Sequence, residues 1–412
     1  MKLSYKTTTL ACYLGSVLQA VSVNMPPVLF VIFQEDFGVT YSQLGTLIMV
    51  TFFLQIIVDY FLARFSSRFS ARFLMVTCAI LTLIGYAFIA LSPVLFPGHM
   101  FISLLLACVF HACGSGIIEV MTSPITDAIP SEDKGSSMAL LHSFYCWGSL
   151  GAILLTTLML LAFGRARWQL IPLIWMIVPL TAAVLYMICP FPEMLSGHEE
   201  QNGNALLKMG LFWAAVMVMI ASGASEQAMS QWASMFAQKA LGVEKTTGDI
   251  FGPCLFALLM GSGRLVYGIL GDKLDMHKAL MGSAMLCIVS YLLAVFAPHP
   301  AVSLMGLGLC GLSVSMMWPG TLVLSSKAMP KGGTQLFALL ALGGDIGCSM
   351  GPWATGLISD ALSVSGLNQR LQMGVDEFSL KGGLLFSIVF PVLLMIFLPI
   401  VTRKGKKKET KA

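Results

Sequence analysis

Seven ionisable side chains interrupt stretches of sequence that are otherwise almost entirely apolar. They are Asp59, His111, Glu119, His142, Glu226, Arg264 and Asp345. An ionisable group in hydrocarbon costs on the order of 3 kcal/mol or more, so such groups usually face a protein interior or a wet cavity. Burial favours the neutral form of a carboxyl group, which allows it to take up and release a proton. Glu119, Glu226 and Asp345 are therefore candidates for proton coupling.

Two of these carboxylates lie on polar helical faces. One face comprises Ser115, Glu119, Thr122 and Thr126, and the other, beside Glu226, comprises Gln227, Gln231, Ser234 and Gln238. Both sets recur at the spacing of one side of a helix. Any single hydroxyl or amide can instead bond its own helix or cross-link helices. Because the polar residues recur along one face of each helix, the two faces together predict that Glu119 and Glu226 face one solvated path.

Aromatic and amide side chains accompany the carboxylates and suit a polar organic solute. Aromatic rings can stack on the apolar face of a sugar ring while carboxylates and amides bind its hydroxyls. The candidate binding residues are Asn24, His111, Glu119, His142, Tyr145, Glu226, Gln227, Gln231, Trp232, Trp318 and Asp345. Alternatives remain open for several of these residues. The aromatic rings can instead pack against other helices, and His142 can instead lie at the membrane interface. Glu119 or Glu226 can instead be a buried carboxylate that Arg264 neutralises.

The elements that carry these residues are membrane spans. The chain of 412 residues is 57% hydrophobic and 11% charged, against about 25% charged in ordinary soluble domains. Stretches of about 20 apolar residues cross a bilayer as helices. The sequence predicts an all-α membrane protein with twelve transmembrane helices at residues 9–33, 42–65, 72–93, 98–128, 136–163, 167–190, 207–238, 248–271, 278–297, 300–326, 334–360 and 380–401.

The distribution of basic residues predicts the orientation. With both termini cytoplasmic, 17 of the 24 Lys and Arg residues fall in cytoplasmic segments, and six in external loops. Such a bias is typical of loops that stay in the cytoplasm. The basic tail at 403–412 is expected to lie near anionic lipid. We therefore expect the lipid bilayer to be a partner, and no nucleic acid.

An internal repeat divides the chain. The stretch "AIPSEDKGSSMALLHSFYCWGSLG" is similar to "AMPKGGTQLFALLALGGDIGCSMG", which matches Pro130 with Pro330 and Gly148 with Gly347. We therefore predict two pseudo-symmetric six-helix halves. The predicted parts are an N-terminal bundle at 1–190, a cytoplasmic connector at 191–206, a C-terminal bundle at 207–402 and the tail.

Enzymatic and metal motifs are missing from the sequence. The ten cysteines fall within predicted spans without metal-ligand spacing. Neither a nucleotide-binding G-x-x-x-x-G-K-S/T loop nor an H-E-x-x-H motif occurs. We expect no enzyme, no cofactor and no bound metal.

One repeated loop resembles the signature of the major facilitator superfamily. "GRLVYGILGDKLDMHK" matches G-x-L-x-D-R/K, while the N-terminal counterpart "YFLARFSSRFSAR" has Ala63 in place of the acid. The resemblance implies the major facilitator fold, in which this loop braces helix ends. The candidate gating residues are therefore Asp59, Arg64, Arg264, Asp272 and Lys273.

Three spans resemble the fucose permease branch, which contains sugar and proton symporters. "GSGIIEVMTSP" is similar to its pattern G-x-G-x-x-E-x-x-x-x-P, with Gly114, Gly116, Glu119 and Pro124 in place. "MMWPGTLVLSSKAMP" and "GGDIGCSMGPWATGLISD" resemble its spans 10 and 11. The family's acid on span 1 has no counterpart, since "SVNMPPVLF" offers Asn24 instead.

The resemblance implies a secondary active transporter that moves a small polar solute, most simply a sugar, by alternating access coupled to protons. Three alternatives stay open: a sodium-coupled carrier, an organic-anion carrier that uses Arg264, and a membrane sensor or lipid-handling protein of the same fold that does not transport. The expected setting is a multi-pass monomer in a bacterial inner membrane, whose partners are a small-molecule substrate and a coupling proton.

Overall fold

The computed structural model describes residues 4–65, 68–130, 134–192, 206–270 and 275–409. The side chains of 63–64, 134–139, 142, 268–270, 331, 333–334 and 403–409 are outside this description. The described helices divide into two compact units, Met1–Gly197 and His198–Ala412. This division falls within the segment predicted as a connector, most of which is not described.

Within the described residues, twelve helices are long and apolar enough to span a membrane. This confirms the predicted number of spans and the all-α fold class, and makes the chain a multi-pass membrane protein. The boundaries differ most for the first span, which runs to Phe37 rather than residue 33. It ends there because Gly38 adopts the left-handed conformation (φ 67°) and closes the last turn.

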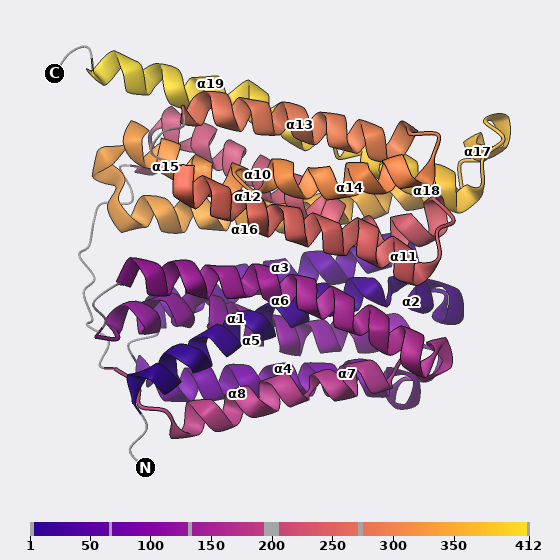
Figure 1. Cartoon of the computed structure of the whole chain (residues 1–412), viewed down its shortest axis with the longest axis horizontal. Coiled ribbons are helices and arrows are strands. Elements are labelled where there is room, and N and C mark those ends of the chain that lie inside the picture. Colours follow the sequence, from indigo (N-terminus) through magenta and orange to yellow (C-terminus); the bar gives the residue numbers. More distant parts are fainter. Residues whose placement is uncertain (1–3, 66–67, 131–133, 193–205, 271–274, 410–412) are drawn as a thin grey trace. The chain divides into compact units, whose positions relative to one another are not determined.

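The first unit contains six spans, shown side by side in Figure 1. Its helices are α1 (Tyr5–Val28), α2 (Phe30–Phe37), α3 (Tyr41–Phe65), α4 (Ala71–Leu95), α5 (Met100–Ala128), α6 (Lys134–Phe163), α7 (Leu170–Trp175) and α8 (Ile177–Ile188). The first span is broken into α1 and α2 after Pro26 and Pro27, because proline lacks the N–H that continues a helix.

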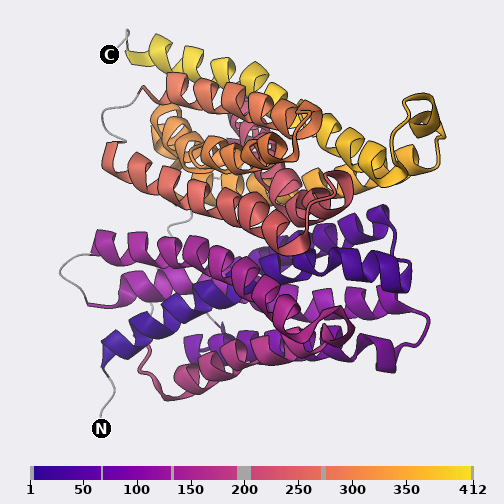
Figure 2. The same cartoon turned by 45° about the vertical axis from the view of Figure 1, so that its right-hand side comes forward.

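The second unit contains the other six spans (Figure 2). Its helices are α10 (Gly210–Met235), α11 (Lys245–Asp249), α12 (Leu255–Leu270), α13 (Met276–Phe296), α14 (Pro300–Val314), α15 (Met317–Ala328), α16 (Gly333–Ser363), α17 (Leu367–Arg370), α18 (Val375–Phe386) and α19 (Val389–Glu409). Two π-helical turns, Phe236–Ala240 and Ile250–Cys254, continue α10 and lead into α12. The short helix α17 was not predicted, and it lies beyond the ends of the bundle helices (Figure 1).

The matched glycines of the repeat occupy equivalent packing positions. Gly148 of α6 faces α1, where an added Cβ would lie 3.0 Å from the Ala20 Cβ. Gly347 of α16 faces α10, where an added Cβ would overlap the Ile220 carbonyl oxygen. Small residues let helix backbones approach closely in membranes. Each unit therefore packs its fifth span against its first through a glycine, as the repeat predicts.

Gly347→Ala is expected to destabilise the protein by about 3 kcal/mol, because the new methyl group meets backbone that cannot rotate away. Gly282→Ala is the matched control, since a Cβ there meets nothing within 4 Å. Alanine is the better helix former, so the control should melt at or slightly above the native temperature. Thermal unfolding in detergent measures both. Equal melting temperatures would contradict the close contact between α10 and α16.

Candidate functional site

Two glycines of α5 bring Glu119 beside a second acid. Gly114 packs on α4, where a Cβ would lie 2.7 Å from the Cys78 carbonyl oxygen, and Gly116 packs on α3, where it would lie 2.9 Å from the Val58 Cβ. The next residue of α3 is Asp59. Carboxylate oxygens of Asp59 and Glu119 lie within 4.8 Å of one another. The G-x-G-x-x-E pattern is thus a packing device that pairs two carboxyl groups.

Among the described residues, the Asp59–Glu119 pair has one amide partner and no cation in an ion pair with it. Gln19 of α1 donates from Nε2 to Glu119 Oε2 at 3.1 Å. The buried Asp59 Oδ1 has no hydrogen-bond partner, and neither acid forms an ion pair with any residue the structure describes. Two carboxylates this close repel when both are charged, so binding one proton or one cation relieves the repulsion. The pair is the strongest candidate proton site of the first unit.

The other candidate binding residues of the first unit have different surroundings. Asn24 joins α1 to α6, donating to the Ala20 carbonyl at 2.9 Å and to Ser149 Oγ at 3.1 Å. Tyr145 lies one turn before Ser149 and is half-buried. His111 is buried, at 1% exposure, against Gly85 of α4. The side chain of His142 is outside the described residues. Asn24 is thus a helix cross-link, and Tyr145 lies beside it.

In the second unit, Glu226 of α10 is ion-paired. Arg264 Nη2 of α12 lies 3.1 Å from Glu226 Oε2, and Gln227 Nε2 donates to Glu226 Oε1 at 3.3 Å. Gln231 Nε2 in turn donates to Gln227 Oε1 at 3.2 Å, and Ser230 Oγ to the same oxygen at 3.3 Å. The stripe predicted on this span is therefore one connected network around a compensated carboxylate.

Two aromatic candidates of this unit have different surroundings. Trp232 has 0% exposure, and its indole Nε1 donates to the Pro352 carbonyl at 3.0 Å. This ring is enclosed at the α10–α16 contact, so the prediction that it stacks on a solute is not supported. Trp318 is half-buried against Gly344, the residue before Asp345. Asp345 is buried, at 6% exposure.

The gating candidates separate into three groups. Asp59 belongs to the carboxyl pair, and Arg264 belongs to the Glu226 network. The side chain of Arg64, and Asp272 and Lys273 in the loop itself, are outside the described residues. Sequence reasoning missed Gln19, although a lone amide in an apolar span is a signal of the kind that identified Gln227.

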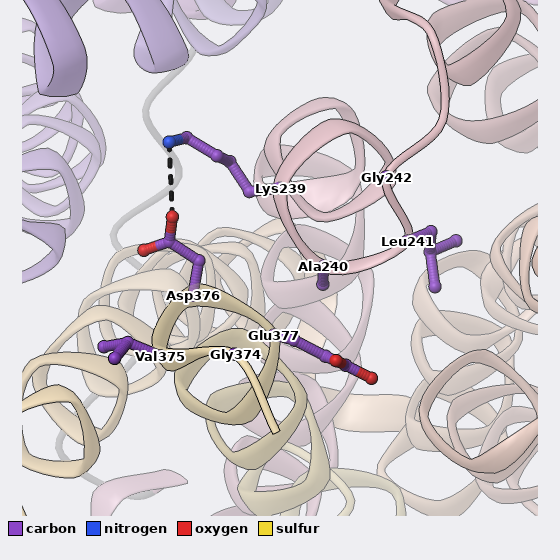
Figure 3. Close-up of a pocket in the computed structure, with 8 residues that line it drawn as sticks. All are labelled: Lys239, Ala240, Leu241, Gly242, Gly374, Val375, Asp376 and Glu377. Atoms are coloured by element: carbon purple, nitrogen blue, oxygen red, sulfur yellow. Dashed lines mark hydrogen bonds and ion pairs between the residues drawn. The ribbon is translucent and has the colours of Figure 1, made fainter. Parts of the chain in front are cut away.

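A pocket of about 560 Å³ opens on the surface at the α17 end of the second unit (Figure 3). It is lined by the residues that follow α10, Lys239–Gly242, and by the start of α18, Gly374–Glu377. Lys239 Nζ lies 3.2 Å from Asp376 Oδ2. Partly exposed ion pairs contribute little stability. The sequence did not predict this pocket, and it lies apart from the Glu226 network.

Twelve spans in two six-span units, each with a polar network inside, define a multi-pass membrane protein of transporter type. Residues 12–352 match the family model of the Major Facilitator Superfamily, and the chain belongs to this family. The predicted superfamily is thereby confirmed. No curated protein sequence matches the chain.

Three solved structures share the fold. A bacterial homolog of the human lysosomal transporter Spinster is 17% identical, with a TM-score of 0.80 and 97% of each chain covered. A D-xylose-proton symporter is 14% identical, with a TM-score of 0.77, covering 94% of this chain and 97% of its own. The E. coli fucose:proton symporter is 16% identical, with a TM-score of 0.63, and the match covers 97% of this chain and 99% of the symporter. These identities show the fold alone.

Proposed function

We propose that the protein carries a small polar organic solute, in the simplest form a sugar, across the membrane by alternating access coupled to proton movement. The observation that carries the proposal is the Asp59–Glu119 pair, with carboxylate oxygens within 4.8 Å and no cation beside them among the described residues. A bound proton removes one of the two negative charges and the repulsion between them, which lowers the cost of closing a dry site around the pair.

The second unit supports a polar solute through its amides. Gln227, Gln231 and Glu226 offer donors and acceptors of the kind that bind hydroxyl groups. Arg264 is engaged with Glu226, which makes an organic-anion carrier less favourable. Two of the structural relatives are proton symporters of D-xylose and fucose.

The orientation, membrane and oligomeric state belong to the same proposal. We place both termini in the cytoplasm from the bias of Lys and Arg, and the protein in a bacterial inner membrane as a monomer. The cytoplasmic loops would then include the signature loop, which contains the gating candidates Asp272 and Lys273.

Uptake by proteoliposomes tests the function. Monosaccharides, disaccharides, nucleosides and organic acids are offered under an inward proton gradient, an inward sodium gradient, or neither. We expect a neutral sugar to accumulate under the proton gradient alone, with alkalinisation outside the vesicles. Accumulation under the sodium gradient alone would mean that the carboxyl pair binds a metal cation instead of a proton. Without uptake under any gradient, the proposal of a solute carrier fails.

A further inference from the structure

Several buried side chains among the described residues of the first unit have polar atoms without partners, and four of them lie on the adjoining helices α3 and α5. Within the described part of the chain, no hydrogen-bond partner reaches Gln55 Nε2, either ring nitrogen of His111, Ser115 Oγ or Ser103 Oγ. All four residues are at most 1% exposed. Buried polar atoms are nearly always satisfied by protein or water, so such a cluster calls for a functional explanation.

Helical spacing connects this cluster to the carboxyl pair. His111, Ser115 and Glu119 follow one another at intervals of four on α5, and Gln55 and Asp59 do so on α3. Residues four apart on a helix have Cβ atoms about 6 Å from each other, which one bridging water spans. The two helices touch here, since a Cβ on Gly116 would lie 3.3 Å from the Gln55 Cα.

The same face continues from His111 toward the Met100 end of α5. Thr51 of α3 and Cys108 of α5 lie close together, one turn beyond Gln55 and His111. The Thr51 hydroxyl donates to the Leu47 carbonyl at 2.8 Å. Ser103 is about 12 Å further along the helix axis than His111. The polar groups therefore run from the carboxyl pair toward one end of the unit. Elsewhere on α5, the residues Ile117, Ile118, Met121 and Ile125 pack with apolar residues of α1 and α4.

We propose that Ser115 and His111, with Gln55 beside them, form a proton path that links the Asp59–Glu119 pair to the Met100 end of α5. The inference rests on the proposed proton coupling. A proton leaves the carboxyl group through water and the Ser115 hydroxyl, and binds one ring nitrogen of His111. The imidazolium then releases the proton that its other nitrogen holds, so that charge and atoms balance. Chains of Asp, Glu and His serve as such relays in membrane proteins.

Few other groups of this unit can compete for the proton. Helices α1, α3, α4 and α6 pack against α5. Along the packed lengths, the described titratable side chains of these four helices are Cys12, Tyr13, Tyr41, Asp59, Tyr60, Cys78, Tyr86, Tyr145 and Cys146, and α5 itself adds Cys108, Cys113, Glu119 and Asp127. Cysteine and tyrosine ordinarily ionise above about pH 8. Among the described side chains along these packed lengths, the carboxyl groups and His111 are thus the groups that exchange protons near neutral pH.

Infrared spectroscopy after a pH jump tests the path with the proton itself as probe. The full chain in sealed vesicles is acidified on the side facing the Met100 end, and the carboxyl band that Glu119→Gln removes is followed in time. We expect His111→Gln to slow protonation of the pair by about tenfold, less than the loss of a direct acid–base group, because water substitutes in part. His299→Gln, at an exposed site in the second unit, is the control and should leave the rate unchanged.

Each outcome decides between the two proposals. If the native protein shows no pH-dependent carboxyl band, the proposed proton coupling is wrong. If the native band appears and His111→Gln protonates at the native rate, the path is wrong and the coupling stands. If His111→Gln lowers the amplitude of the band but leaves the rate of protonation unchanged, His111 only affects the environment of the carboxyl pair. The proposed path is then wrong as well. Where His111→Gln does not fold, Ser115→Ala decides by the same rate, since it removes a single oxygen atom that has no partner.

Discussion

Glu119→Gln is expected to reduce substrate-driven proton uptake by at least about 100-fold, the contribution typical of a positioned acid–base group. Glutamine keeps the shape of the side chain, and its carbonyl oxygen can still accept from Gln19 Nε2. What it cannot do is bind and release a proton. Asp59 then loses its charged neighbour, so the repulsion that a bound proton relieves in the native pair is gone.

The variant should still exchange labelled for unlabelled solute across the vesicle membrane, because exchange requires no net proton release. External pH and counterflow are measured on the same vesicles. Glu377→Gln, which removes a charge from the surface pocket of the second unit, serves as the control and should behave like the native protein. An unchanged pH signal from Glu119→Gln would show that the pair does not couple transport to protons.

Arg264→Leu is expected to destabilise the protein by about 3 kcal/mol, the lower end of the cost of breaking a buried ion pair. The Glu226 side chain is 10% exposed, and Arg264 is the one cation that the structure places in an ion pair with it among the described residues. Removing the cation leaves a carboxylate that must be protonated or hydrated. The change in melting temperature in detergent measures the loss.

A double-mutant cycle separates the pair from simple packing. The combination of Arg264→Leu with Glu226→Leu should recover most of the lost stability, because replacing both partners by apolar groups is often neutral. Arg165→Leu is the matched control, since Arg165 pairs with Glu35 and Asp36 while its side chain is 42% exposed. Such a pair contributes at most about 1 kcal/mol. Failure of the double variant to recover would mean that the network, not the pair, sets the stability.

The transmembrane pattern was predictable because it depends on local composition. Spans of about 20 apolar residues are readable from the chain, and the structure has helices at all twelve predicted positions. The extension of the first span to Phe37 was not predictable, because it depends on the left-handed conformation of Gly38. Helix α17 was missed because Leu367–Arg370 is too short to show a periodic pattern.

The candidate site was predictable residue by residue but not in its pairings. Glu119 was identified by its position in an apolar span, and Glu226 by the amide stripe around it. Asp59 was predicted as a gating residue, and the structure adds that it lies beside Glu119. Trp232 was predicted to contact a solute, and the structure encloses its ring at a helix contact. Arg264 was weighed as the neutraliser of a carboxylate or as a gate residue, and its 3.1 Å bond to Glu226 supports the first interpretation.

By itself, the sequence determined that this is a membrane protein with twelve spans and a repeat, because hydropathy and repetition are properties of consecutive residues. The tertiary structure alone decided which polar groups meet, since this depends on how closely neighbouring helices approach and at what rotation. Gly114 and Gly116 set that approach around Glu119, as Gly347 does between α10 and α16. Residues 60 positions apart, Asp59 and Glu119, thereby become one site, and no periodicity along the chain carries that information.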